Sequence, residues 1–155
     1  MTVVVGVDSS AGSQAVIRLA AQEARYRTAR LMAVMAYSGE RTLGAPATRP
    51  LATLRTAEEE RVLTDATLRD IVRDALGPQA DDVEYLPVAG VPGRALVEAA
   101  RATGAQLVVL STRGEATARM LGAVSQHVLR HAPCPVLVVP DGSRSVLNGK
   151  PEHEK

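Results

Sequence analysis

A length of 155 residues suits one ordinary domain and is enough to bury a substantial core. The composition, 46% hydrophobic and 23% charged, is globular, and no apolar run approaches the roughly 20 residues that a membrane-spanning helix needs. A net charge of +1, without Phe or Trp, argues against nucleic acid or an anionic membrane as a partner, because the chain offers neither a strongly basic surface nor a set of stacking rings.

The chain opens on a strand. Residues 2–8 form a near-continuous apolar run of the kind that is buried on both faces of a sheet, without the basic region of a secretory signal. Ser9, Ser10 and Gly12 form a turn, and Ser10 is expected to cap a helix that runs to about Arg27. The second strand covers residues 30–37.

A long segment, residues 38–55, then carries two Gly and two Pro, and we expect a solvated loop, with a lid over a crevice as the alternative. Thr56 and Glu59 form a capping box that starts the second helix, and Gly77-Pro78 ends it. The third strand covers residues 82–89.

The turn Gly90-Val91-Pro92 leads into a third helix that stops near Gly104, and the fourth strand covers residues 106–110. A glycine-containing loop, an amphipathic helix and a Pro-Cys-Pro break precede the fifth strand, which runs from Pro135 to Val139. Strands that alternate with helices are typical of βαβ units and therefore predict an α/β protein with a parallel sheet.

The stretch LVVLSTRGEATARMLGAVSQHVLRHAPCPVLVVP, residues 107–140, resembles the C-terminal signature of the universal stress protein family. The resemblance implies a single domain over residues 1–140, followed by a polar tail over residues 141–155. It also implies an adenine-nucleotide alpha-hydrolase-like fold, in which an open parallel five-stranded sheet of order 3-2-1-4-5 carries helices on both faces. By the same analogy the protein acts in stress survival, by binding a nucleotide or a partner protein rather than by catalysis.

The nucleotide motif departs from the family pattern, in which ATP-binding members carry Gly-x-x-Gly, nine residues, then Gly-Ser or Gly-Thr. Ser111 stands where the first Gly belongs, only seven residues separate Gly114 from Gly122, and Ala123 replaces the hydroxyl residue. The shortening would move a phosphate cradle of backbone N–H groups. We therefore predict that ATP binding is weak or absent, with binding of ATP or another adenine nucleotide as the alternative.

Gly114, Gly122 and Ser125 nevertheless stand at positions that match the family motif, and Arg113 could supply a cation for phosphate. In the implied strand order the chain reverses direction between strands one and four, and ligands of open α/β sheets bind at the carboxyl ends of the strands at such a point. Asp8 and Ser111 mark these two ends.

The resemblance implies that Asp8 holds the adenine or ribose end of a nucleotide, while the alternative is that Asp8 caps the turn before the first helix. Ala36 matches a family position that touches adenine through backbone groups, and Gly90 matches a turn close to the nucleotide. The alternative for Gly90 is an ordinary strand-to-helix turn.

Other residues carry weaker signals. His127 and His131 have the i, i+4 spacing of a metal pair, but without a third ligand we expect surface histidines and no metal site. Cys134, the single cysteine, excludes an internal disulfide, suits a reducing cytoplasm and is expected to be half-buried and structural rather than catalytic. A receiver domain is excluded because the third strand ends in Val88-Ala89, without a phosphoacceptor.

Three functional alternatives therefore remain open. A slow ATPase would need a metal-binding acid beside the phosphates, and Asp8 is the only evident candidate, so we expect no catalytic residues. An interaction protein with an empty crevice and an unknown protein partner is the rival to nucleotide binding.

The fifth strand, an apolar edge strand in the implied order, predicts a homodimer through Pro135 to Val139.

Overall fold

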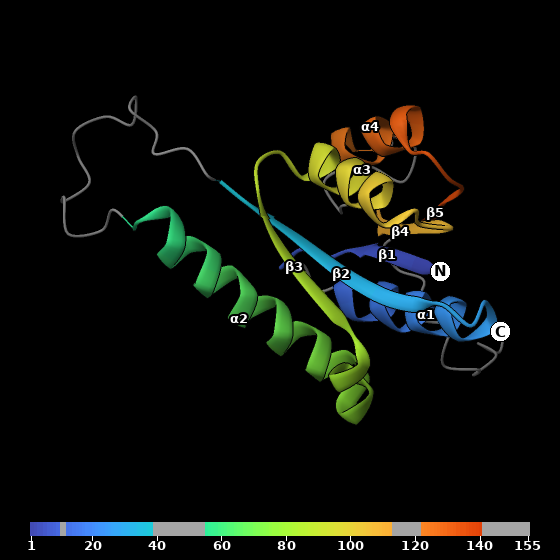
Figure 1. Ribbon diagram of the computed structural model, residues 1–155, viewed down its shortest axis with the longest axis horizontal. Coiled ribbons are helices and arrows are strands. Elements are labelled where there is room, and N and C mark those ends of the chain that lie inside the picture. The colour runs from blue at the N-terminus through green and yellow to red at the C-terminus, as the bar shows by residue number, and fades with distance from the viewer. Residues whose placement is uncertain (10–11, 39–54, 113–121, 141–155) are drawn as a thin grey trace, which may run out of the picture.

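The computed structural model describes residues 1–9, 12–38, 55–112 and 122–140 of the chain (Figure 1). Its elements are β1 (Thr2–Gly6), α1 (Ser13–Tyr26), β2 (Arg30–Tyr37), α2 (Ala57–Leu76), the 3₁₀ helix η2 (Gly77–Asp82), β3 (Glu84–Ala89), α3 (Pro92–Thr103), β4 (Leu107–Ser111), α4 (Ala123–His131) and β5 (Val136–Val139). The strands form one sheet of order β3-β2-β1-β4-β5 in which every pair is parallel, so the α/β fold and the strand order implied by the resemblance are confirmed.

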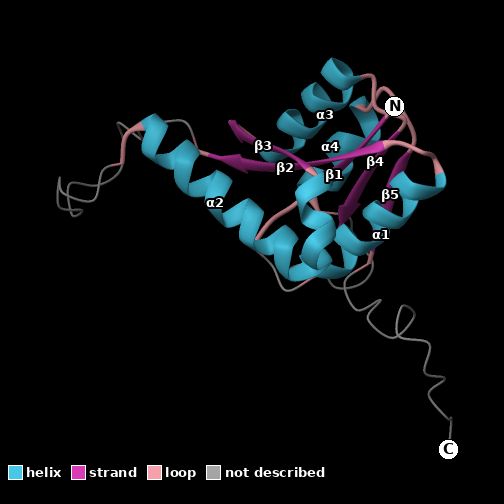
Figure 2. Ribbon diagram, turned by 60° about the horizontal axis from the view of Figure 1, so that its bottom comes forward, coloured by secondary structure: helices cyan, strands magenta, loops and turns pink. Residues whose placement is uncertain are grey.

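Two layers of helices enclose the sheet. Helices α1 and α2 cover one face and α3 and α4 cover the other, and Figure 2 shows the sheet between these two layers. Successive side chains of a strand point to opposite faces, so Val3 and Val5 join the cluster under α1 and α2, whereas Val4 joins the cluster under α3 and α4. All three valines are completely buried, which explains why β1 reads as an uninterrupted apolar run.

The central position of β1 creates the switch point. β1 pairs with β2 on one side, where Val3 lies opposite Leu31, and with β4 on the other, where Val3 lies opposite Leu107. The chain runs from β1 outward to β3 in one direction and then returns to β4 and β5 in the other. The carboxyl ends of β1 and β4 therefore border the crevice in which open α/β proteins bind ligands.

Several predicted boundaries are wrong by one or two residues. β1 ends at Gly6, so Asp8 lies in the following turn, and the N-cap of α1 is Gly12 rather than Ser10. β3 begins at Glu84 because η2 occupies the preceding residues, and the Tyr85 hydroxyl holds this turn by donating to the carbonyl of Ala80 at 2.7 Å. β4 runs from Leu107 to Ser111, and β5 begins at Val136.

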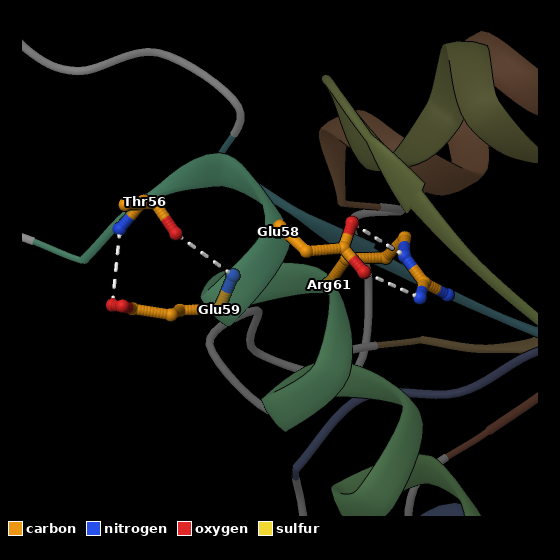
Figure 3. A network of polar contacts seen from close by, with 4 residues as sticks. All are labelled: Thr56, Glu58, Glu59 and Arg61. Carbon is orange, nitrogen blue, oxygen red and sulfur yellow. Dashed lines mark hydrogen bonds and ion pairs between the residues drawn. The ribbon is translucent and has the colours of Figure 1, made fainter.

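The start of α2 confirms the predicted capping box (Figure 3). The Glu59 amide donates to Thr56 Oγ1 and the Thr56 amide donates to Glu59 Oε2, both at 3.1 Å. Glu58 adds a two-pronged ion pair with Arg61, at 2.8 and 3.1 Å, and this hydrogen-bonded guanidinium lowers the pKa of the Glu58 carboxyl. Acidic side chains in the first turn also complement the positive end of the helix dipole.

None of the helices in the described part of the chain is long and apolar enough to cross a membrane.

Candidate functional site

A pocket of about 150 Å³ opens at the carboxyl ends of the central strands, at the switch point. Five segments contribute its lining, which consists of Gly6, Val7, Asp8 and Ser9 after and within β1, Val34, Met35 and Ala36 of β2, Pro92 and Leu96 of α3, Leu110 and Ser111 of β4, and Val124 of α4. The pocket therefore brings together Asp8, Ala36 and Ser111, three of the residues that the sequence singles out.

Asp8 is held in place by the start of α1. The Ser13 hydroxyl lies 2.6 Å from the Asp8 carbonyl oxygen and 3.1 Å from Asp8 Oδ1, and both oxygens accept from it. Ser13 is 4% exposed, so this link is shielded from water. A carboxylate has about four lone-pair sites, so the local role of Asp8 in the turn is compatible with a contact to a ligand. Ser13 could not be recognised from the sequence, because a serine in the first turn of a helix carries no signal of its partner.

The end of β2 and the turn after β3 meet beside the pocket. The Gly90 amide donates to the carbonyl of Tyr37 at 2.8 Å, and Gly90 has φ +129°, a conformation that favours glycine. Gly90 is not among the described residues that line the pocket, whereas Pro92, two residues later, is. The predicted turn therefore reaches the pocket through its proline.

The structure describes only part of the nucleotide motif, residues 111–125. Gly122 is the N-cap of α4 and Ser125 is 2% exposed within that helix, and neither is among the described residues that line the pocket. Val124, between them, does line it. Arg113 and Gly114 lie outside the described residues, so the predicted phosphate cradle is not part of the observed geometry.

The pocket has an apolar inner wall and a polar rim. The wall combines the buried side chains of Val34, Leu96 and Leu110 with half-buried Val124, while Pro92 is exposed. Sequence reasoning missed Leu96 and Val124 because they are far from β1 in the chain. The rim carries the carboxylate of Asp8 and the hydroxyls of Ser9 and Ser111. An apolar slot with a few convergent polar groups suits a flat, partly apolar ligand that carries hydroxyl or amino groups.

The histidine pair lies on α4, away from the pocket lining. The rings of His127 and His131 are stacked with centroids 4.3 Å apart, and His131 Nδ1 lies 2.8 Å from the carbonyl oxygen of His127. His127 is half-buried rather than a surface residue, because α3 approaches α4 closely at Gly93. Among the described residues, no group of three or more His, Cys, Asp or Glu side chains is placed to hold a metal ion.

Cys134 is half-buried, as predicted from the sequence, and packs against the cluster under α3 and α4. Burial raises the pKa of its thiol, because the thiolate loses hydration. A thiol with a raised pKa is a poor nucleophile at neutral pH, which is consistent with a structural role.

An open parallel sheet with a pocket at its switch point places the chain in the class of α/β proteins whose ligand sites, where they occur, lie at the carboxyl ends of the strands. The particular family follows from comparison with known proteins. Residues 1–140 match the universal stress protein family, and the chain belongs to that family, as the sequence motif predicts.

Individual relatives support this membership. The chain is 33% identical over 142 residues to a universal stress protein of Mycobacterium tuberculosis, a match that covers 90% of this chain and 47% of the relative. The chain thus spans about half of that relative's length. It is 32% identical over 142 residues to a universal stress protein of Thermus aquaticus, covering 89% of this chain and 97% of that protein.

A solved structure extends the likeness to three dimensions. The crystal structure of a universal stress protein in complex with cyclic AMP has a TM-score of 0.63 and 31% sequence identity to this chain, covering 90% of this chain and 96% of that one.

Proposed function

We propose that this chain acts in the stress response by binding an adenine nucleotide or nucleoside in the switch-point pocket, without turning it over. The observation that carries the proposal is the pocket itself, in which the Asp8 carboxylate stands at the rim of an apolar slot. Ribose hydroxyls and the adenine amino group are donors that a carboxylate accepts, and an adenine ring suits apolar walls. The complex of a 31% identical protein with cyclic AMP supports this ligand class.

The phosphate end of a nucleotide contributes less in this proposal. Ser111 and Ala123 replace a glycine and a hydroxyl residue of the family motif, and the spacing between Gly114 and Gly122 is two residues short. Loss of one hydrogen bond to phosphate costs about 1 kcal/mol, or roughly fivefold in affinity, and a displaced cradle costs more. We expect adenosine and cyclic AMP to bind more tightly than ATP.

We expect binding without turnover because the described lining of the pocket offers few acidic side chains that could hold a catalytic metal ion. Phosphoryl transfer to water needs a metal held beside the phosphates and a positioned water molecule. Asp8 is the only acidic residue among the described residues that line the pocket. Slow nucleotide hydrolysis remains the alternative, and phosphate release from ATP with Mg²⁺ tests it, since turnover above the rate without protein contradicts the proposal.

Calorimetry with adenosine, cyclic AMP, AMP and ATP tests the binding proposal. Asp8→Ala removes a charged acceptor and is expected to weaken adenosine and cyclic AMP by about 10- to 100-fold. Asp70→Ala removes an exposed carboxylate from α2 and serves as the control, with unchanged binding. Tight ATP binding that depends on Asp8 contradicts the expected ligand order. No response to any of the four ligands favours the interaction protein with an empty crevice.

We further propose that β5 forms a homodimer interface. β5 lies at one edge of the described sheet, with Val136, Leu137 and Val138 half-exposed, and an apolar edge strand invites pairing with another chain. Sedimentation is expected to give twice the chain mass of 16.3 kDa. Val138→Lys is expected to give a folded monomer, while Val62→Lys, at an exposed position of α2, stays dimeric. A monomeric wild-type chain contradicts the proposal.

A single cysteine suits a reducing compartment, so the proposal places the protein in the cytoplasm, where a protein partner of unknown identity would respond to the bound state.

A further inference from the structure

Gly6 and Leu96 meet at the inner wall of the pocket. Gly6 is the last residue of β1, and a Cβ atom added there would lie 2.8 Å from Leu96 Cδ1 and 3.1 Å from Leu96 Cδ2. Carbon atoms in good contact are about 3.5–4.0 Å apart, so any larger residue at position 6 displaces the leucine. Leu96 is 4% exposed, and both residues line the pocket.

The packing around α3 places the Leu96 side chain between the core and the open space of the pocket. Pro92 and Leu96 lie one helical turn apart and both line the pocket, while Val97 and Ala100 are buried in the core behind them. At Gly93 the helix is also close to α4, since a Cβ there would lie 3.1 Å from His127 Cβ. The backbone of α3 is therefore held by the sheet below it and by α4 beside it, and because Leu96 lines the pocket, a methyl displaced by a larger residue at position 6 can enter the pocket.

We propose that Leu96, seated on Gly6, is a specificity-determining residue that sets the depth of the pocket and so the size of the base that it accepts. This inference rests on the proposed function, because it assumes an adenine ring against the apolar wall. The ligand class is then a purine nucleoside or nucleotide without bulky substituents on the base. In this proposal Leu96 makes only van der Waals contact with the base and takes part in no reaction.

Two substitutions change the pocket in opposite directions. Gly6→Ala keeps the fold, since only the end of a flexible side chain must move, and it weakens adenosine by about 10- to 200-fold because a methyl group fills part of the slot. Leu96→Ala removes three carbon atoms and opens the wall. It is expected to bind at least one adenosine with an isopropyl group at N6, C2 or C8 that the wild-type chain rejects, because this group has the three carbon atoms that the substitution removes.

The controls separate binding from stability. Leu68→Ala makes the same substitution in the core under α2, where the side chain is 0% exposed, and it lowers stability without changing which adenosines bind. Leu96→Val is a milder variant that shifts the preference in the same direction as Leu96→Ala. Circular dichroism and urea unfolding without ligand establish that each variant is folded before calorimetry.

Two failures are distinguishable. If the wild-type chain binds adenosine, but Gly6→Ala binds it equally well and both Leu96 variants reject every enlarged adenosine, the pocket depth is not set by this pair and only the inference is overturned. If the wild-type chain binds neither adenosine nor cyclic AMP, the proposed function fails and takes the inference with it.

Discussion

Replacing Ser13 with Ala removes the hydroxyl that ties the turn after β1 to the first residue of α1. The single hydroxyl proton is shared between the Asp8 carbonyl oxygen at 2.6 Å and Asp8 Oδ1 at 3.1 Å, so the shorter bond to the carbonyl dominates. Loss of the bond to the carbonyl oxygen is expected to lower the stability of the fold. Loss of the bond to Oδ1 removes one restraint on the orientation of the Asp8 carboxylate in the pocket.

The structure sets the size of both effects. Ser13 is 4% exposed, so water does not fully replace the lost donor, and we expect the free energy of unfolding to fall by about 1–2 kcal/mol. For a domain of this size the melting temperature then falls by about 2–4 °C per kcal/mol. Adenosine affinity is expected to fall by about three- to tenfold, less than in Asp8→Ala, because the carboxylate is misplaced rather than absent.

Urea unfolding and calorimetry with adenosine measure the two effects. Thr103→Val is a matched control, because the Thr103 hydroxyl donates to the Ala99 carbonyl at 2.7 Å within α3 and does not line the pocket. It is expected to lower stability slightly and leave binding unchanged. A Ser13→Ala variant that is as stable as the wild-type chain refutes the role assigned to the hydroxyl. Lost stability with unchanged affinity refutes the argument that Ser13 orients Asp8.

Three further outcomes are expected. Thr56→Ala lowers the free energy of unfolding by about 1 kcal/mol in urea, because it removes the cap of α2, whereas Thr56→Ser keeps the capping hydroxyl. Leu68→Ala lowers it by about 2–5 kcal/mol, since the side chain is 0% exposed, and a smaller loss would show that the core collapses around the cavity. Burial raises the pKa of the Cys134 thiol, so alkylation by iodoacetamide is slow at neutral pH and accelerates only above the ordinary thiol range, whereas the urea-unfolded chain reacts within that range. The raised pKa also means that this thiol contributes stability below its ordinary range and loses it as the pH rises through the folded-state pKa.

Local patterns predicted most of the elements, because they depend on neighbouring residues. The valine run of β1 favours a buried strand, and the spacing of Thr56 and Glu59 favours a capping box at a helix start. Both predictions are confirmed. Strand order is different, since parallel strands can be arranged in several ways with the same local patterns. The order came from the resemblance to a family, and its consequence, the placement of Asp8 beside Ser111, followed from topology.

Only the tertiary structure decided the shape of the site. Leu96 lies 90 residues after Gly6 in the chain, and nothing in either sequence position indicates that they touch. The sequence also does not indicate that His127 is half-buried, because its burial depends on how closely α3 approaches α4. Periodicity tells which side of an element is apolar, but the distance between two packed elements is set by the smallest side chains at their crossing, and that distance determines the size of the pocket.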